Sequence, residues 1–180
     1  MAGTDGLTHI TDHIRDVPDF PKPGIVFKDI TPLLATPAAF ATAVDLMAEP
    51  FVGSGVTRVC GAESRGFIFG VAVAERLGAG FVPIRKPGKL PRAVHEASYE
   101  LEYGRDTLQM HTDALPAGGT VLLVDDLLAT GGTAAACCRM IEKAGAELVG
   151  VAVLIELSFL PGRAALPAGV PVHAAVTVAG

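Results

Sequence analysis

The sequence of 180 residues contains no tryptophan, and aromatic residues make up only 6% of it. Hydrophobic residues are nevertheless half of the chain, so the core must be built mainly from valine, leucine, isoleucine and alanine. A core of this kind is typical of an α/β fold, in which a parallel sheet is covered by helices. A chain of this length needs only one domain, and we predict a single domain over residues 1–180.

An excess of positive charge is also missing, since the formal net charge is -5. A general nucleic-acid binder needs a basic face, so this class is excluded and any anion site must be local. The apolar stretch Val149–Ile155 is far shorter than the roughly 20 residues that span a bilayer, so we expect no membrane span. Residues 1–11 lack the pattern of a secretory signal, and we expect a cytoplasmic protein.

The few cysteines and histidines are not spaced as a disulfide pair or a metal site would require. Cys60, Cys137 and Cys138 form no C-x-x-C pair, and neighbours on one helix diverge too far for an ordinary disulfide, so we expect reduced core residues. His9 and His13 are four positions apart, but no third ligand is near them in the sequence. We therefore expect surface imidazoles there and no zinc site.

Strand and helix signals alternate along most of the chain. We predict helices at 7–15, from Pro37 to Pro50, at 67–77 and at 133–144, and strands at 58–62, 80–84, 120–124 and 148–155. Such alternation predicts right-handed βαβ units, a parallel sheet and ligands at the carboxyl ends of its strands.

One region departs from this alternation. Tyr99, Leu101 and Tyr103 alternate with Glu100 and Glu102, and a Gly-Arg-Asp turn then precedes further alternating apolar residues. This pattern predicts an antiparallel hairpin near residues 95–111, outside the main sheet, with the two glutamates on one face.

The strongest chemical signal is the run from Val121 to Thr133. A buried strand leads to Asp125 and Asp126, and a loop of small residues then opens a helix. Backbone N–H groups, two threonine hydroxyls and the helix N-terminus can together bind a phosphate. An isolated acidic pair would more often be solvated, but beside a phosphate loop we interpret it as binding ribose hydroxyls, with a divalent metal nearby.

A second candidate site is cationic. Arg85, Lys86, Lys89 and Arg92 lie within eight positions of one another, directly after a predicted strand. Taken alone, such a cluster is equally well explained as a solvated basic loop. Its position after a sheet strand favours binding of an anion near the phosphate loop.

The run from Val121 to Thr133 resembles the phosphoribosyl pyrophosphate signature of the type I phosphoribosyltransferases, and its ending resembles their adenine-specific branch. Further matching blocks at 20–30, 63–67, 84–91 and 98–104 extend the resemblance over nearly the whole chain. It implies the type I phosphoribosyltransferase fold, a central mostly parallel sheet flanked by helices, with a flexible antiparallel hairpin over the active site.

The resemblance also implies roles for individual residues. It implies a cis peptide bond between Glu63 and Ser64, and Glu102 as the group that assists proton removal from the base. Pyrophosphate would be bound by Arg65, Lys86 and Lys89, with Arg85 serving this site or that of a neighbouring subunit. Phosphate and ribose would be bound by Ala129, Thr130, Gly131, Gly132, Thr133, Asp125 and Asp126. The base pocket would be formed by Leu157 and by an N-terminal segment with Val26, Phe27 and Lys28. Relatives often carry arginine in place of Lys28.

The activity implied is purine salvage, in which adenine and phosphoribosyl pyrophosphate give AMP and pyrophosphate. Mg²⁺ would be held mainly by the substrate, with Asp125 as the one protein group that adds to its coordination, and the chain would form a homodimer. Two alternatives stay open: a phosphoribosyltransferase for another purine base, and a non-catalytic regulator that senses phosphoribosyl pyrophosphate. The regulator predicts an added nucleic-acid-binding element, which neither the N-terminus nor the net charge supports.

Overall fold

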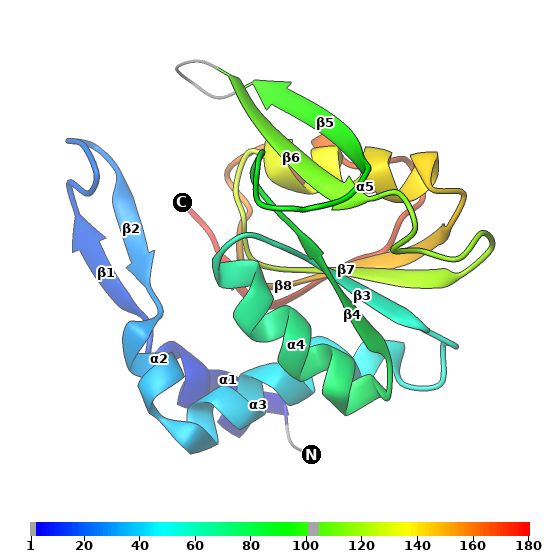
Figure 1. Ribbon diagram of the computed structural model, residues 1–180. Helices are drawn as coiled ribbons and strands as arrows, with labels where there is room; N and C mark the ends of the chain where they lie inside the picture. Colours follow the sequence, from blue (N-terminus) through cyan, green and yellow to red (C-terminus); the bar gives the residue numbers. More distant parts are fainter. Residues whose placement is uncertain (1–2, 101–104) are drawn as a thin grey trace. The chain divides into compact units, whose positions relative to one another are not determined.

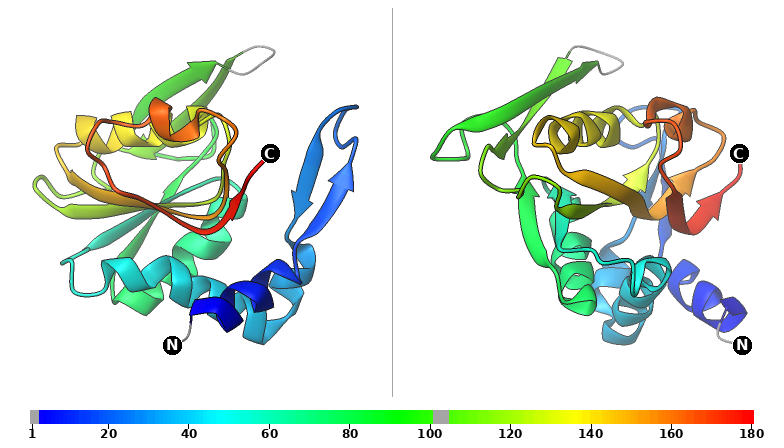
Figure 2. Two further views of the ribbon diagram at one scale, coloured as in Figure 1. Left: turned by 180° about the vertical axis from the view of Figure 1, so that it is seen from behind. Right: turned by 90° about the vertical axis from the view of Figure 1, so that its right-hand side faces the viewer.

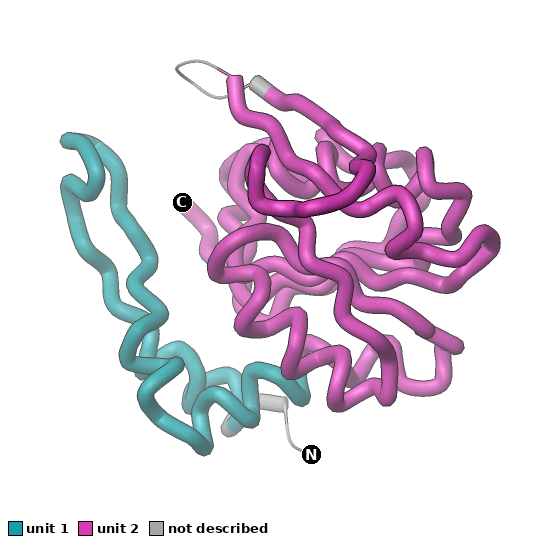
Figure 3. Tube along the Cα trace, viewed as in Figure 1, with its two compact units in different colours: residues 1–46 teal, residues 47–180 magenta. Residues whose placement is uncertain are grey.

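The structure, a computed structural model, describes residues 3–100 and 105–180 (Figure 1). The chain divides into two compact units, residues 1–46 and residues 47–180 (Figure 3). The single domain over residues 1–180 stays a prediction. Within the described ranges, no helix is both long enough and apolar enough to cross a membrane.

The first unit combines short helices with a two-stranded antiparallel ribbon. Its elements are α1 (Gly3–Thr11), β1 (Arg15–Pro18), β2 (Val26–Asp29), α2 (Thr31–Ala35) and α3 (Pro37–Ala48). The helix predicted at 7–15 is wrong at its end, because α1 stops at Thr11 and Arg15 pairs with Asp29 across the ribbon. Local periodicity does not reveal a strand partner fourteen positions away, and this pairing overrides the helical signal.

The second unit is built on five parallel strands in the order β4-β3-β7-β8-β9. Its elements are η1 (Glu49–Phe51), β3 (Arg58–Ala62), α4 (Arg65–Leu77), β4 (Gly80–Ile84), β5 (Val94–Glu100), β6 (Arg105–His111), β7 (Thr120–Leu128), α5 (Gly132–Lys143), β8 (Glu147–Leu157), η2 (Gly162–Ala165) and β9 (Val172–Val178). The predicted α/β class and parallel sheet are confirmed.

Helices α4 and α5 cover opposite faces of this sheet (Figures 1 and 2). Helix α4 ends where Gly78 adopts a left-handed conformation, as the glycine at that position predicted. The central strands between the helices are mostly buried, with side chains such as Leu122 and Leu123 almost inaccessible to solvent. All three cysteines are buried and unbridged, and burial raises the pKa of the Cys60 thiol to about 12.

In the second unit, β7 and β9 differ most from the prediction. Strand β7 continues to Leu128, so Asp125 and Asp126 lie within the strand and not after it. The reason is backbone pairing, because Asp125 lies opposite Val153 and the ladder to β8 continues beyond it. Strand β9 was not predicted, since its sequence holds a histidine and two alanines and shows little strand pattern.

The predicted hairpin is confirmed as the antiparallel pair β5 and β6, with Tyr99 opposite Asp106. The hairpin packs beside α5 (Figures 1 and 2). Leu108 and Met110 of β6 are buried in the core, and the Arg139 guanidinium of α5 donates a hydrogen bond of 2.8 Å to the Ser98 carbonyl. The described part of the hairpin is therefore anchored to the body of the second unit.

Candidate active site

A cavity of about 440 Å³ lies at the carboxyl ends of β3 and β7, where α4 and α5 begin. This is the edge at which parallel sheets bind ligands. Its walls bring together the predicted acidic pair, phosphate loop and two of the predicted cations. The lining residues are Glu63, Ser64, Arg65, Lys86, Asp125, Asp126, Leu127, Leu128, Ala129, Thr130, Gly131, Gly132, Thr133 and Ala134.

The phosphate loop connects β7 to α5 through residues 129–131. Gly131 has a φ of 83°, and a Cβ atom there would lie 2.5 Å from the Gly162 carbonyl oxygen and 2.8 Å from the Ala165 Cβ. Of the two adjacent glycines in the loop, Gly131 is the one that needs a positive φ, because Gly132 already begins the helix. The free N–H groups of the first turn and the helix dipole make this end of α5 suited to an anion.

The acidic pair is tightly enclosed. Asp126 is 7% exposed, and its carboxylate pairs with the Arg65 guanidinium at 2.9 Å. Burial raises the pKa of Asp125, and the neighbouring charge of Asp126 raises it further. Burial also raises the pKa of Asp126, although Arg65 opposes this effect. A Cβ atom on Gly66 would lie 2.7 Å from Asp125 Oδ1, so the first turn of α4 packs directly against this carboxylate.

Arg65 owes its position to the connection between β3 and α4. The peptide bond between Glu63 and Ser64 is cis, as the resemblance predicted, and Arg65 is the first residue of α4. Its side chain lines the cavity and is 34% exposed. Arg65 can therefore reach both Asp126 and a ligand.

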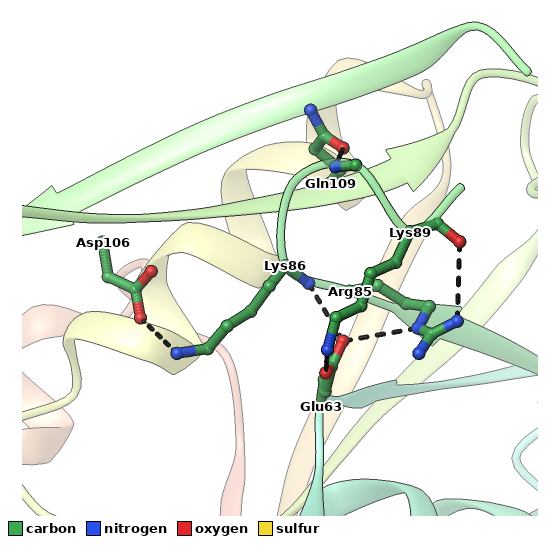
Figure 4. A network of polar contacts seen from close by, with 7 residues as sticks. Glu63, Arg85, Lys86, Lys89, Asp106 and Gln109 are labelled. Carbon is green, nitrogen blue, oxygen red and sulfur yellow. Dashed lines mark hydrogen bonds and ion pairs between the residues drawn. The ribbon is translucent and has the colours of Figure 1, made fainter. Parts of the chain in front are cut away.

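The basic loop after β4 is organised by one carboxylate, that of Glu63 (Figure 4). Its Oε2 accepts hydrogen bonds from the Lys86 backbone N–H at 3.1 Å and from Arg85 Nε at 3.3 Å, and its Oε1 accepts from the Lys89 ammonium. The Glu63 side chain is only 11% exposed, and these donors, Lys89 first, lower its pKa.

The predicted cations differ in whether they face the cavity or pair with a carboxylate outside its lining or at its edge. Lys86 lines the cavity together with Arg65, whereas Arg85 and Lys89 are not among the lining residues and pair with Glu63. Arg92 pairs with Asp113, and both of these side chains are well exposed. Only part of the cationic cluster thus faces the cavity in this structure.

Two hairpin side chains, Asp106 and Tyr99, contact residues that line the cavity. The sequence analysis assigned neither of them to the site. Asp106 Oδ2 lies 3.2 Å from Lys86 Nζ and accepts a hydrogen bond of 3.3 Å from the Tyr99 hydroxyl. The Thr133 hydroxyl donates to Tyr99 at 3.1 Å. The Asp106 carboxylate raises the pKa of Lys86. The only sequence signal for this connection was the alternation of the hairpin, which sets Tyr99 opposite Asp106.

The remaining predicted residues are Glu102 and the four residues of the predicted base pocket. Glu102 lies outside the described residues. Val26, Phe27 and Lys28 lie on β2 in the first unit, where Lys28 Nζ forms an ion pair of 2.6 Å with Asp16, and Leu157 ends β8 in the second unit. The base pocket formed from these two segments stays a prediction.

Comparison with known proteins identifies the family of this chain. The family model of the phosphoribosyl transferase domain matches residues 33–163. The adenine phosphoribosyltransferase of Thermobifida fusca is 56% identical over 97% of this chain and 99% of its own length, and that of Streptomyces coelicolor is 53% identical over 99% of this chain and 100% of its own.

Solved structures lead to the same family. The crystal structure of adenine phosphoribosyltransferase from Rhodothermus marinus is 53% identical, with a TM-score of 0.91 over 97% of this chain and 99% of its own. The Saccharomyces cerevisiae enzyme, complexed with an imino-altritol bisphosphate and adenine, is 39% identical, with a TM-score of 0.90 over 95% of this chain and 98% of its own. The expected type I phosphoribosyltransferase fold is thereby confirmed, and the chain belongs to the adenine phosphoribosyltransferases, a family of pentosyl-transferring enzymes.

Proposed function

We propose that this chain transfers the phosphoribosyl group of phosphoribosyl pyrophosphate to adenine and so forms AMP and pyrophosphate in purine salvage. The observation that carries the proposal is one cavity that joins a helix N-terminus, the buried carboxylate of Asp126, the partly buried carboxylate of Asp125 and two cations. A substrate with a phosphate, a ribose and a pyrophosphate needs these three kinds of group in this order. The purine is assigned from the relatives, which are adenine enzymes.

The 5′-phosphate is bound by the phosphate loop in this proposal. Backbone N–H groups of Ala129, Thr130, Gly131, Gly132 and Thr133 and the two threonine hydroxyls supply its donors. Thr133 has one hydroxyl proton, which Tyr99 now accepts, so donation to a phosphate requires this proton to turn toward the cavity. The carboxylates of Asp125 and Asp126 accept hydrogen bonds from the ribose hydroxyls.

The cations at the cavity stabilise the pyrophosphate leaving group in this proposal. The bond from the anomeric carbon to pyrophosphate loosens, positive charge develops on the sugar, and Arg65 and Lys86 stabilise the departing anion. A ring nitrogen of adenine then bonds to the opposite face of that carbon. Lys89 and Arg85 contribute from the basic loop, which requires them to leave or share the Glu63 carboxylate that now binds them.

Mg²⁺ is the cofactor we propose, bound mainly by substrate oxygens. The Asp125 carboxylate offers hard oxygen ligands of the kind that Mg²⁺ prefers, and Mg²⁺ usually binds through one or two carboxylates together with phosphates. Among the described residues no group of three or more histidine, cysteine, aspartate or glutamate side chains is arranged to hold a metal. Asp125 therefore fits a metal that would arrive with the substrate and neutralise the charge of the pyrophosphate.

The proton of the base is assigned to Glu102, which takes it as the new bond to the anomeric carbon forms. Glu102→Gln keeps the size of the side chain but removes the acceptor, so kcat should fall by about 10²–10⁴-fold with much smaller changes in KM. Steady-state kinetics with adenine measures this effect. Glu100→Gln is the matched control on the same predicted face and should be nearly silent. A larger loss for Glu100→Gln would move the catalytic role to that residue.

A homodimer and a cytoplasmic location complete the proposal. The dimer is proposed from the family resemblance alone, and the exposed apolar side chains Ile68 and Val71 on α4, which are 40% and 52% exposed, are candidate contact residues. Sedimentation equilibrium at micromolar concentration should give twice the chain mass, and a single-chain mass would remove this part of the proposal.

The decisive experiment mixes the protein with phosphoribosyl pyrophosphate, Mg²⁺ and one purine base at a time. Adenine should give AMP and pyrophosphate, whereas hypoxanthine, guanine and xanthine should give little nucleotide. Preference for another base would change the substrate and keep the chemistry. Absence of product with every base, together with tight binding of phosphoribosyl pyrophosphate, would favour a ligand-sensing role.

A further inference from the structure

The short helix η2 packs against the back of the phosphate loop through two glycines. Gly162 is buried, and a Cβ atom on it would lie 2.5 Å from the Ala129 carbonyl oxygen and 2.9 Å from Leu128 Cγ. Conversely, a Cβ atom on Gly131 of the loop would lie 2.5 Å from the Gly162 carbonyl oxygen of η2. The backbones of η2 and of the loop are therefore in direct contact, and a displacement of one requires a displacement of the other.

The side chain of Arg163 fastens η2 to the sheet. Its Nε and Nη2 donate to the two carboxylate oxygens of Glu156 at 2.5 and 2.8 Å, and its Nη1 donates to the Val172 carbonyl at 3.0 Å. Glu156 is 6% exposed near the end of β8, and Val172 begins β9. A planar guanidinium can make such a two-pronged contact, whereas a lysine ammonium cannot.

We propose that Arg163 is a positioning residue, which holds η2 against the phosphate loop and so keeps the loop in the shape that binds the 5′-phosphate. Arg163 does not line the cavity, so it acts through the Gly162–Gly131 contact. Glu156 takes part as the fixed, mostly buried end of the clamp. The inference rests on the proposed function, because it assigns the loop to the 5′-phosphate and the basic side to pyrophosphate.

The separation of these two subsites supplies a direct test. Isothermal titration with ribose 5-phosphate probes the phosphate loop, and titration with pyrophosphate and Mg²⁺ probes the side formed by Arg65 and Lys86. Arg163→Gln should weaken ribose 5-phosphate binding about threefold to fivefold, the upper part of the range for loss of a partly exposed pair with bidentate geometry, and should leave pyrophosphate binding within about twofold. Arg163→Lys keeps the charge without the fork and should lie in between.

Two further measurements make the result decisive. Arg58→Gln is the matched control, because Arg58 lies at the start of β3, away from the cavity, and donates to the Thr57 carbonyl. It should change neither affinity. In kinetics, Arg163→Gln should raise KM for phosphoribosyl pyrophosphate and leave KM for adenine unchanged.

The titrations can overturn the positioning role in two ways. Arg163→Gln could lose affinity equally for ribose 5-phosphate and pyrophosphate, or Arg163→Gln and Arg163→Lys could both bind ribose 5-phosphate as tightly as the wild type. If Arg163→Gln fails to fold, Arg163→Lys alone decides by the ratio of the two affinities. Failure of the wild-type protein to bind either ligand or to form nucleotide would instead remove the proposed function.

Discussion

The two sides of the cavity offer anions different kinds of groups. The phosphate loop, residues 129–133, carries no charged side chain and relies on backbone N–H groups, hydroxyls and a helix end. The basic loop after β4 offers Lys86, with Arg85 and Lys89 behind it, and in this structure Glu63 and Asp106 accept hydrogen bonds from these cations or pair with them. Fixed neutral donors need no counter-charge, whereas clustered cations are costly unless carboxylates stand beside them.

This difference has a consequence for robustness. The shape of the phosphate loop depends on backbone conformation and on close contacts at glycines, so a single methyl group can destroy it. The basic loop depends on flexible side chains in partly exposed ion pairs, each of which contributes little alone. Substitutions should therefore have larger effects at the first loop than at the second.

Among substitutions in the two loops, the largest effect is expected for Gly131→Val. A valine at a φ of 83° is strained, and its Cβ would collide with the Gly162 carbonyl, so kcat/KM should fall by about 10²-fold or more as the loop is displaced. Gly169→Val is the matched control, because Gly169 has the same φ of 83° but no atom within 4 Å of its Cβ position. Similar losses of activity in both variants would trace the effect to strain alone and not to the loop.

A smaller effect is expected for Glu63→Gln on the basic side. The amide cannot accept from both cations, so the loop should loosen and pyrophosphate should bind about threefold to tenfold more weakly in calorimetry. Asp113→Asn removes the carboxylate of the exposed pair with Arg92 and should change nothing. Tighter binding in Glu63→Gln would show that its carboxylate competes with the substrate for Arg85 and Lys89.

The smallest effect is a change in thermal stability. At pH 7, neutralising Asp125 should raise Tm, whereas neutralising Glu63 should lower it. Burial raises the pKa of Asp125, so stability is lost as the pH rises from about 4, the pKa of an unfolded aspartate, through the raised folded value. Asp125→Asn should therefore raise Tm by a few degrees at pH 7, and the gain should vanish below about pH 4.

Glu63 shows the reverse dependence. Lys89 and the other donors lower its pKa, so its contribution is present above the unfolded glutamate pKa of about 4.3 and is lost as the pH falls through the folded value. Glu63→Gln should lower Tm at pH 7 and converge with the wild type in acid. Thermal unfolding monitored by circular dichroism from pH 3 to pH 8 measures both variants. Parallel Tm curves for the two variants would contradict the distinction between the carboxylates.

Much of the candidate site could be read from residues 121–133, because strand, acidic pair, loop and helix follow one another without interruption. The extent of β7 could not, since only the ladder to β8 keeps Asp125 and Asp126 in the strand. The strand Arg15–Pro18 was missed for the same reason, as its partner β2 is remote in sequence. Glu63 lay inside a matching block, but its contacts to Arg85 and Lys89 connect residues more than twenty positions apart.

The sequence by itself determined the parallel α/β class, the phosphate loop and the hairpin, because hydrophobic periodicity and glycine placement act over a few neighbouring residues. Only the tertiary structure decided which cation faces the cavity, which glycine needs a positive φ and how Tyr99 and Asp106 join the hairpin to Thr133 and Lys86. Those outcomes depend on distances between segments far apart along the chain, and a charge or hydroxyl acquires its partner only when folding brings such segments within hydrogen-bonding range.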